Sequence, residues 1–293
     1  MLTLPARAHR HTPSGKRIRL SRISDHRTGR TLVVPLDHSV TVGPLGSADH
    51  ADTLIRTLAD AGADAVVLHR GRARHVDPDA FANMGLIVHL SAGTTMSIDT
   101  HAKTLVAGVE DALRMGADAV SVHVNIGSAT ERVQLEDFGR ISAECETLGV
   151  PLLAMMYARG AGRSGMPTAA ELAHLASIAT DLGADMVKLD YSGSSETMRA
   201  VAASCPLPIC VAGGDRAGDD QDVVALAAEI MDSGVAGLSF GRNIFEATHP
   251  HGVASALAHL VHDRGSAGNR TGTGTHNAVI GERIDVAAQL ETA

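Results

Sequence analysis

The chain has 293 residues, of which 44% are hydrophobic and 20% are charged, and its formal net charge is −8. A chain of this length buries a large core, as one barrel-sized domain or two smaller ones, and its acidic balance disfavours nucleic-acid binding. Neither a signal peptide nor a run of apolar residues long enough for a membrane span is evident, so we expect no membrane association.

The three cysteines, Cys145, Cys205 and Cys210, are odd in number and lack C-x-x-C spacing. Cysteines of this kind in an apolar setting are most often reduced thiols, which suits a cytoplasmic protein. We therefore expect a cytoplasmic chain without disulfides.

A glycine-led phrase recurs along the chain where a helical pattern gives way to an apolar run. It occurs at 62–66, 116–120 and 183–187 as Gly-Ala-Asp followed by two apolar residues, and at 234–238 in a variant form. Glycine suits the left-handed residue that ends a helix, and an apolar run suits a strand buried on both faces. The phrase therefore predicts a repeated turn from helix to strand.

Eight strands are predicted in chain order, and amphipathic segments lie between them. The strands are 31–36, 64–69, 85–90, 119–124, 151–157, 186–191, 208–212 and 236–240, and the helices include 49–61, 104–115, 131–148, 168–182 and 221–233. Residues 71–84 break the helical period, so the second helix should be short or irregular. Eight alternating units favour a single (β/α)8 TIM barrel over a doubly wound sheet.

The barrel is predicted to cover residues 31–264. Residues 1–30 form a short N-terminal extension, in which 17–20 are expected to act as a lid under the barrel. Residues 265–293, rich in Gly, Thr, Asn and Ser, are predicted to form a flexible polar tail with one amphipathic turn at 280–290. Neither end of the chain is expected to carry catalytic residues.

Lys188 is the most informative single residue. The chain has only three lysines but twenty-two arginines, and Lys188 lies within the predicted strand 186–191. Burial of an unpaired ammonium lowers its pKa, which yields a nucleophilic amine, and arginine cannot replace lysine in forming a Schiff base. We therefore predict covalent carbonyl chemistry at Lys188.

Polar residues follow the predicted strands, where a TIM barrel places its active site. They include Asp37 and His38, His69, His89, His123, Tyr157 with Arg159, and Tyr191 beside Lys188. Taken singly, His38, His69 and His89 fit polar caps on the barrel rim better than functional groups. Taken together, the set predicts that acids, bases and a nucleophile converge on one face.

Two glycine-bearing segments follow the last two strands. Gly213 and Gly214 come after strand seven, and Gly241 precedes Arg242 after strand eight. Glycines let backbone N–H groups approach an anion, a short helix beginning near Arg242 presents its positive end, and the guanidinium adds charge-assisted bonds. These loops therefore predict a phosphate site.

Six ordered motifs resemble the archaeal-type class I aldolases, over about residues 17–263. Within that family the chain most resembles the branch whose members make seven-carbon amino keto sugars. The motifs lie at 35–38, 123–128, 154–160, 184–188, 211–214 and 241–245.

The resemblance implies a role for each matching residue. Lys188 is implied as the Schiff-base lysine, Tyr157 as the general acid/base, and Asp37 as a second proton-transfer or hydroxyl-orienting group. His123, Arg159 and His38 are expected to bind substrate, and Gly213, Gly214, Gly241 and Arg242 to hold the phosphate of a ketose. Three acids just after the first glycine pair, Asp215, Asp219 and Asp220, depart from the family pattern.

The expected reaction joins a ketose phosphate, dihydroxyacetone phosphate or a relative, to L-aspartate semialdehyde. A fructose-1,6-bisphosphate aldolase is the main alternative, and Arg70, Arg72, Arg159 and Arg163 are available for its second phosphate. A catalytically silent oligomeric barrel and a metal-dependent lyase are weaker alternatives, the last because the sixteen histidines form no H-E-x-x-H cluster. We expect no cofactor and no metal. The resemblance implies a homo-oligomer, often a decamer.

Overall fold

The computed structural model describes residues 13–44, 46–160, 162–163 and 165–263. The predicted tail at 265–293, with its amphipathic turn, lies outside the described residues, as do residues 1–12 of the predicted extension. No helix in the described ranges has the length and apolar character needed to cross a membrane.

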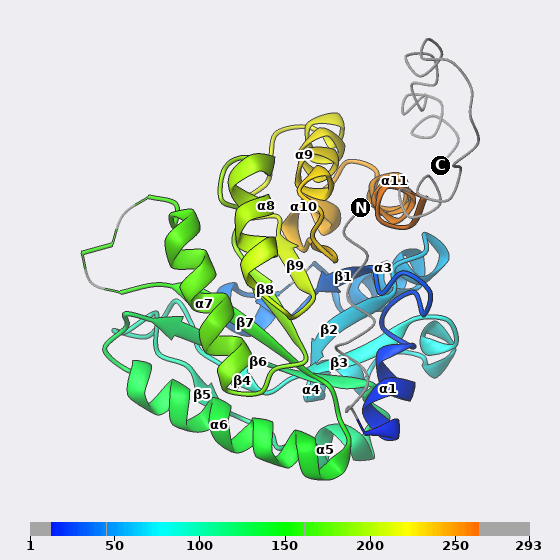
Figure 1. Ribbon diagram of the computed structural model, residues 1–293. Helices are drawn as coiled ribbons and strands as arrows, with labels where there is room; N and C mark the ends of the chain where they lie inside the picture. The colour runs from blue at the N-terminus through cyan, green and yellow to red at the C-terminus, as the bar shows by residue number, and fades with distance from the viewer. Residues whose placement is uncertain (1–12, 45, 161, 164, 264–293) are drawn as a thin grey trace.

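Eight parallel strands close into a barrel at the centre of the molecule (Figure 1), which confirms the predicted fold. Their order around the barrel is β1-β10-β9-β8-β7-β6-β3-β2. Every predicted strand begins within one residue of an observed one. The bounds are β1 Thr31–Pro35, β2 Ala65–His69, β3 Gly85–His89, β6 Ala119–Ile126, β7 Leu152–Ala158, β8 Met186–Leu189, β9 Ile209–Ala212 and β10 Gly237–Ser239.

Helices surround the strands and cover the outer face of the closed sheet (Figure 1). Residues 70–81 form two short pieces, as predicted for the irregular second unit. The helices are α2 His38–Val42, α3 Ala48–Asp60, α4 Arg70–Ala73, the 3-10 helix η1 Pro78–Phe81, α5 Val109–Arg114, α6 Glu131–Leu148, α7 Ala169–Asp181, α8 Ser195–Ser204, α9 Asp220–Asp232, α10 Arg242–Phe245 and α11 Pro250–Asp263.

One predicted helix is wrong in its first turn. The helix expected at 104–115 begins only at Val109, and Thr104–Leu105 instead forms strand β5, which pairs antiparallel with β4, Ser91–Ala92. A short apolar run fits the period of either structure, and the pairing that decides between them comes from residues more than ten positions away. The result is a two-stranded hairpin inserted between β3 and α5.

The recurring glycine-led phrase does form the turn from helix to strand. Its four glycines, Gly62, Gly116, Gly183 and Gly234, have φ between 82° and 87°, which is the left-handed region that favours glycine. The aspartate of the phrase adds a function that the pattern did not predict, because its carboxylate accepts the backbone N–H of a residue in the preceding strand. The pairs are Asp64 with Leu32 at 2.6 Å, Asp118 with Leu86 at 3.0 Å and Asp185 with Leu152 at 2.9 Å.

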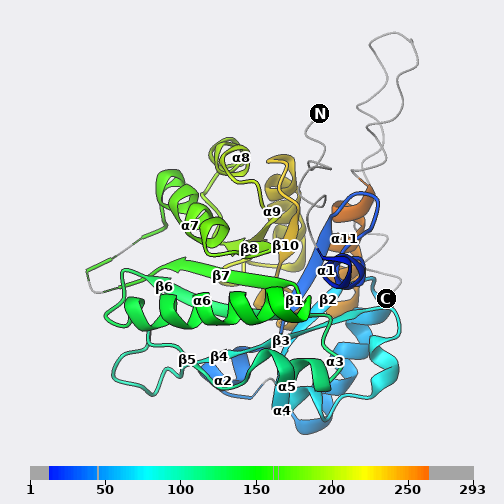
Figure 2. The ribbon, with the colours of Figure 1, turned by 60° about the horizontal axis from the view of Figure 1, so that its bottom comes forward.

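Helix α1, Ser14–Leu20, lies at the N-terminal end of the strands, seen end-on in Figure 2. Its Lys16 is buried and contacts Glu146 at 2.9 Å and Asp185 at 3.0 Å. Ile23, which follows the helix, is fully buried and packs inside the barrel against Val33 and Met186. Ile23, with Leu20 packed against the same cluster, therefore fills this end of the barrel interior.

The alternation of β8 decides where its lysine points. Met186 belongs to the cluster inside the barrel, whereas Val187 and Leu189 belong to the layer between strands and helices. Because successive side chains of a strand point to opposite faces, Lys188 points into the barrel, as Met186 does. Cys145, Cys205 and Cys210 are free thiols, as predicted.

Candidate functional site

Lys188 is 94% buried near the C-terminal end of β8, and Tyr157 on the neighbouring strand β7 is among the groups that act on its charge. Burial alone lowers the pKa of Lys188, but the neighbouring Tyr157, Asp37 and Asp190 outweigh it and raise the pKa above its usual value. The predicted lowering of the pKa is therefore wrong. The sequence pattern of one strand predicts that its lysine is buried. It does not reveal that the carboxylates of Asp37, after β1, and Asp190, after β8, lie near that lysine.

Tyr157 lies on β7, the strand that pairs with β8. Its ring stacks on His123 with centroids 4.6 Å apart, and the Arg159 guanidinium lies 5.3 Å from the ring centre. Burial raises the pKa of Tyr157 and the Lys188 charge opposes that rise. The hydroxyl is therefore protonated in the free protein and can donate a proton to a substrate group bound to Lys188.

Asp37 follows β1 and enters the same space from the other side of the ring of strands. Its carboxylate lies 3.7 Å from Nε2 of His89 and 3.8 Å from Nδ1 of His38. Burial by itself raises the pKa of Asp37, but charge from His89, His38 and Lys188 holds that pKa well below its usual range. Asp37 is therefore a carboxylate, able to accept a proton or a hydroxyl hydrogen bond.

Histidines line the remaining wall of the site. His123 Nε2 lies 2.8 Å from Asn125 Oδ1, His89 Nδ1 lies 2.8 Å from Ser121 Oγ, and His69 meets His89 edge to face at 5.2 Å. Burial lowers the pKa of His89 to about 4 and that of His123 to about 3. Both imidazoles are therefore neutral at pH 7 and offer hydrogen bonds rather than charge.

The predicted phosphate loops lie side by side after β9 and β10. A Cβ on Gly213 would stand 2.6 Å from Asn243 Nδ2, and one on Gly241 would stand 2.8 Å from the His38 ring. Asn243, fully buried, donates to the Gly213 carbonyl at 2.9 Å and accepts from the Ala217 N–H at 2.9 Å. Its side chain therefore holds the two loops together, a role the sequence did not reveal.

Two of the three acids beyond Gly214 have structural roles. Asp219 caps α9, and Asp220 pairs with Arg216 at 2.7 Å and accepts two backbone N–H groups. Only Asp215 engages the phosphate loop, since its exposed carboxylate forms an ion pair with Arg242. An anion that binds Arg242 must therefore compete with Asp215.

The structure thus brings Lys188, Tyr157, Asp37 and His123 together, with His38 against Gly241 and Arg159 beside Tyr157. Tyr191 does not join them, because its hydroxyl donates to Glu229 on α9 at 2.7 Å.

Sequence reasoning missed two charged residues at the site, Lys103 and Asp190. Asp190 follows Lys188 by two positions and lies 3.7 Å from Arg159, while the charge of Lys103 acts on His123 and His89. The sequence feature that could have pointed to Lys103 is the scarcity of lysine in the chain.

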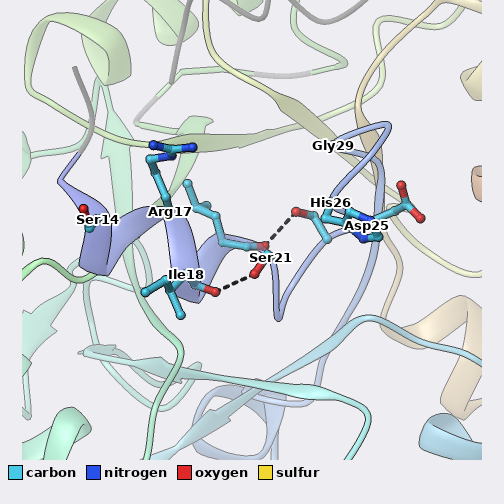
Figure 3. A pocket seen from close by; sticks show the side chains of 9 residues that line it. Ser14, Arg17, Ile18, Ser21, Asp25, His26 and Gly29 are labelled. Atoms are coloured by element: carbon cyan, nitrogen blue, oxygen red, sulfur yellow. Dashed lines mark hydrogen bonds between the residues drawn. The ribbon is translucent and has the colours of Figure 1, made fainter. Parts of the chain in front are cut away.

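One hollow of the molecule lies away from these residues. A cavity of about 420 Å³ is lined by Arg17, Ile18, Ser21 and Asp25 (Figure 3), at the N-terminal end of the barrel. Lys188 stands near the opposite end of its strand, so this cavity is not part of the site. Within the described ranges, no group of three or more His, Cys, Asp or Glu side chains is arranged to hold a metal ion.

Chemically, the site combines a buried amine, a neutral phenol and an ionised carboxylate around one space, beside a glycine-bearing anion site. An amine in this setting adds to a carbonyl, and the phenol and carboxylate can move the protons that the addition and its reversal require.

Comparison with known proteins agrees with this chemistry. Residues 31–247 match the family model of DeoC/LacD family aldolases. The chain is 45% identical over 258 residues to the 2-amino-4,5-dihydroxy-6-oxo-7-(phosphonooxy)heptanoate synthase of Streptomyces griseus, covering 88% of this chain and 94% of that protein. It is 41% identical over 252 residues to the 2-amino-3,7-dideoxy-D-threo-hept-6-ulosonate synthase of Halobacterium salinarum, covering 86% and 93%.

A solved Schiff base-forming fructose-1,6-bisphosphate aldolase aligns with a TM-score of 0.76 at 28% identity. The alignment covers 84% of this chain and 99% of the solved chain.

Proposed function

Because the chain belongs to the DeoC/LacD family and is a class I aldolase, we propose that it joins dihydroxyacetone phosphate to L-aspartate semialdehyde through a Schiff base on Lys188. The observation that carries the proposal is the burial of Lys188 inside the barrel, with Tyr157 on the neighbouring strand β7 and Asp37 both acting on its charge.

The product named for the Streptomyces griseus relative supports this choice of substrates. A 2-amino-4,5-dihydroxy-6-oxo-7-phosphonooxyheptanoate divides between carbons 4 and 5 into a three-carbon ketose phosphate and a four-carbon amino acid aldehyde. Those halves are dihydroxyacetone phosphate and aspartate semialdehyde. The glycine loops with Arg242 suit the phosphate of the first half.

The first half of the reaction forms the iminium. Lys188 gives up its ammonium proton to water, and the free amine adds to the ketone carbon of the donor, while the ionised Asp37 accepts a hydrogen bond from a hydroxyl of the donor. The amine then gives up one further proton and Tyr157 supplies another, so that the former ketone oxygen leaves as water. The cationic iminium then stands beside the Tyr157 phenolate and favours that ionised form.

The second half makes the carbon–carbon bond. The Tyr157 phenolate takes a proton from the hydroxymethyl carbon, and the resulting enamine carbon attacks the aldehyde carbon of the acceptor. Tyr157 returns the proton to the new alkoxide. Water then hydrolyses the iminium, which frees the ketone product and the Lys188 amine, and the proton that is released returns to the Tyr157 phenolate.

Borohydride trapping tests the covalent step. Reduction in the presence of dihydroxyacetone phosphate should attach the reduced donor to Lys188, as mass spectrometry of the digested protein would show. Lys188→Met should form no adduct, while Arg132→Gln, an exposed change on α6, should form it at the wild-type level. An unmodified Lys188 with this donor and with other ketose phosphates would overturn the mechanism and favour a silent barrel.

A fructose-1,6-bisphosphate aldolase is the second candidate, favoured by the fold shared with the Schiff base-forming aldolase of that substrate. Both candidates share the donor, so the acceptor separates them. Discharge of the enamine should be faster with aspartate semialdehyde than with glyceraldehyde 3-phosphate. The opposite order would assign the sugar bisphosphate activity.

We further propose that the protein acts in the cytoplasm as a homo-oligomer, for which the family resemblance suggests a decamer. The free thiols support the first point. EDTA should leave the reaction intact, because a lysine iminium supplies the electron sink.

A further inference from the structure

The hairpin inserted after β3 brings a second lysine to the site. Strands β4 and β5 pair Ser91 with Leu105 and Ala92 with Thr104, so Lys103 directly precedes the returning strand. The side chain lies half-buried where the hairpin meets the barrel.

The loop that carries Lys103 is held at several points. Thr95 donates two hydrogen bonds of 3.0 Å to the Thr41 carbonyl of α2, and the His101 carbonyl accepts from Asn125 at 2.8 Å and from Gln134 at 3.0 Å. Figure 2 shows β4, β5 and α2 on the same side of the barrel. A Cβ on Gly93 would stand 3.1 Å from Lys103 Nζ, so the hairpin positions the ammonium closely.

The Lys103 ammonium has no anion in direct contact. It forms no ion pair or hydrogen bond with the part of the chain that the structure describes, although its charge is felt by His89, His123 and Asp37. By contrast, Lys16 pairs with two carboxylates. A half-buried ammonium has lost part of its hydration, so an anion that binds to it stabilises its charge.

Lys103 stands across the barrel from the phosphate loops. In the ring β1-β10-β9-β8-β7-β6-β3-β2, the midpoint of β9 and β10 is diametrically opposite the midpoint of β6 and β3. Gly213 and Gly241 follow the first pair, whereas His123 and His89, which feel the Lys103 charge, belong to the second. A substrate anchored by its phosphate therefore extends its far end toward Lys103.

Three of the four arginines considered for a second anion are engaged. Arg159 lies 3.7 Å from Asp190, Arg70 contacts Asp111 at 3.2 Å, and Arg163 contacts Glu171 at 2.6 Å. The last two pairs are also well exposed to solvent.

We propose that Lys103 binds the carboxylate of the acceptor aldehyde, and so selects aldehydes that carry an acid group at the far end. This inference rests on the proposed function and deepens it. A single ammonium without glycine loops suits a carboxylate, whereas the phosphate at the opposite side has glycine loops and a guanidinium. Lys103 thereby directs which end of the acceptor faces the enamine.

Two aldehydes of equal length isolate the carboxylate. Succinic semialdehyde carries a carboxylate, and butanal has a methyl group in its place. Both have an aldehyde carbon that the enamine of dihydroxyacetone phosphate can attack. Lys103→Gln should lower kcat/KM for succinic semialdehyde about 10- to 100-fold, the range of one charge-assisted contact. For butanal the change should stay within about twofold, because no carboxylate is lost.

Arg163→Gln is the matched control, since it removes one positive charge that already has a partner. It should leave the preference for succinic semialdehyde intact. A wild-type enzyme without that preference, a preference that survives Lys103→Gln, or one that disappears in Arg159→Gln instead would overturn the assignment. A selective loss of glyceraldehyde 3-phosphate turnover in Lys103→Gln would also overturn it, because it would make the position a phosphate site.

The borohydride adduct separates this inference from the proposed function. Lys103→Gln should still trap dihydroxyacetone phosphate on Lys188, because the donor step needs no acceptor. An adduct in wild type without any carboxylate preference rejects the role of Lys103 alone, whereas no adduct in wild type rejects the Schiff-base mechanism itself.

Discussion

At the scale of single residues, the protonation states of the site decide the order of steps. Lys188 is held as an ammonium by the surrounding Tyr157, Asp37 and Asp190, and Tyr157 is held as a phenol by burial. The ammonium is not the nucleophile, so Lys188 must lose its proton before it attacks the donor. Tyr157 acts first as a proton donor and becomes a base only once the iminium has formed.

Asp215 offers a test at the residue scale. Its side chain is 89% exposed and pairs with Arg242, which it partly neutralises. Asp215→Asn should therefore lower KM for dihydroxyacetone phosphate about two- to fivefold at low ionic strength, with less effect at high salt, because surface ion pairs are weak and screened. Steady-state kinetics at two salt concentrations would measure this.

Asp181→Asn makes the same change of charge at an exposed position on α7 and should leave KM unchanged. An unchanged or higher KM in Asp215→Asn would mean that Asp215 does not compete with the phosphate.

At the scale of elements, the ends of the barrel have different tasks. The aspartates of the three Gly-Ala-Asp turns tie neighbouring strands together at the N-terminal end, and each also pairs with a basic side chain. Those side chains are His262 for Asp64, Arg22 for Asp118 and Lys16 for Asp185. The C-terminal end carries the glycine loops and the hairpin with Lys103. Stability and chemistry are thus separated along the strands, as is typical of this fold.

The two partners of Lys16 allow a prediction for helix α1. Lys16→Met leaves Asp185 with no counter-charge at a site where its side chain is 15% exposed, so we expect a loss of roughly 2–4 kcal/mol in unfolding free energy. Burial already raises the pKa of Asp185, and protonation of that carboxyl limits the loss. Glu146 is 63% exposed, so Glu146→Gln should cost less than about 1 kcal/mol.

Urea unfolding of both variants would measure the difference, and the borohydride adduct on Lys188 should be retained in the folded protein of each. Equal losses would show that the pair with Asp185 does not hold α1 in place.

At the scale of the whole molecule, the buried histidines make the protein sensitive to acid. The pKa of His89 is lowered by burial from 6.5 to about 4 and that of His123 to about 3. Between pH 6.5 and about 4 the unfolded chain therefore binds protons that the folded chain does not, so stability falls as pH falls through this window. Asp37 adds nothing there, since its lowered pKa acts only below its ordinary value of 3.8.

We expect the unfolding free energy to drop by roughly 1–2 kcal/mol per buried histidine between pH 7 and pH 5. Urea denaturation at a series of pH values would show this slope. His123→Gln, which keeps a side chain able to bond to Asn125, should have a shallower slope. A variant with the wild-type slope would show that His123 takes up its proton in the folded state.

The sequence by itself determined the eight strands, the left-handed glycine turns and the barrel, because helix and strand periods and turn glycines are local properties of the chain. It also singled out Lys188, Tyr157, Asp37 and the phosphate loops, because a barrel presents the ends of all its strands on one face.

Only the tertiary structure decided the hairpin at 91–105, the place of Lys103, the pairing of Asp215 with Arg242 and the raised pKa of Lys188. Each depends on which residues remote in the chain come to lie side by side. Electrostatic energy depends on the distance between charges in space. The sequence of one strand or loop does not contain the distances to residues remote in the chain.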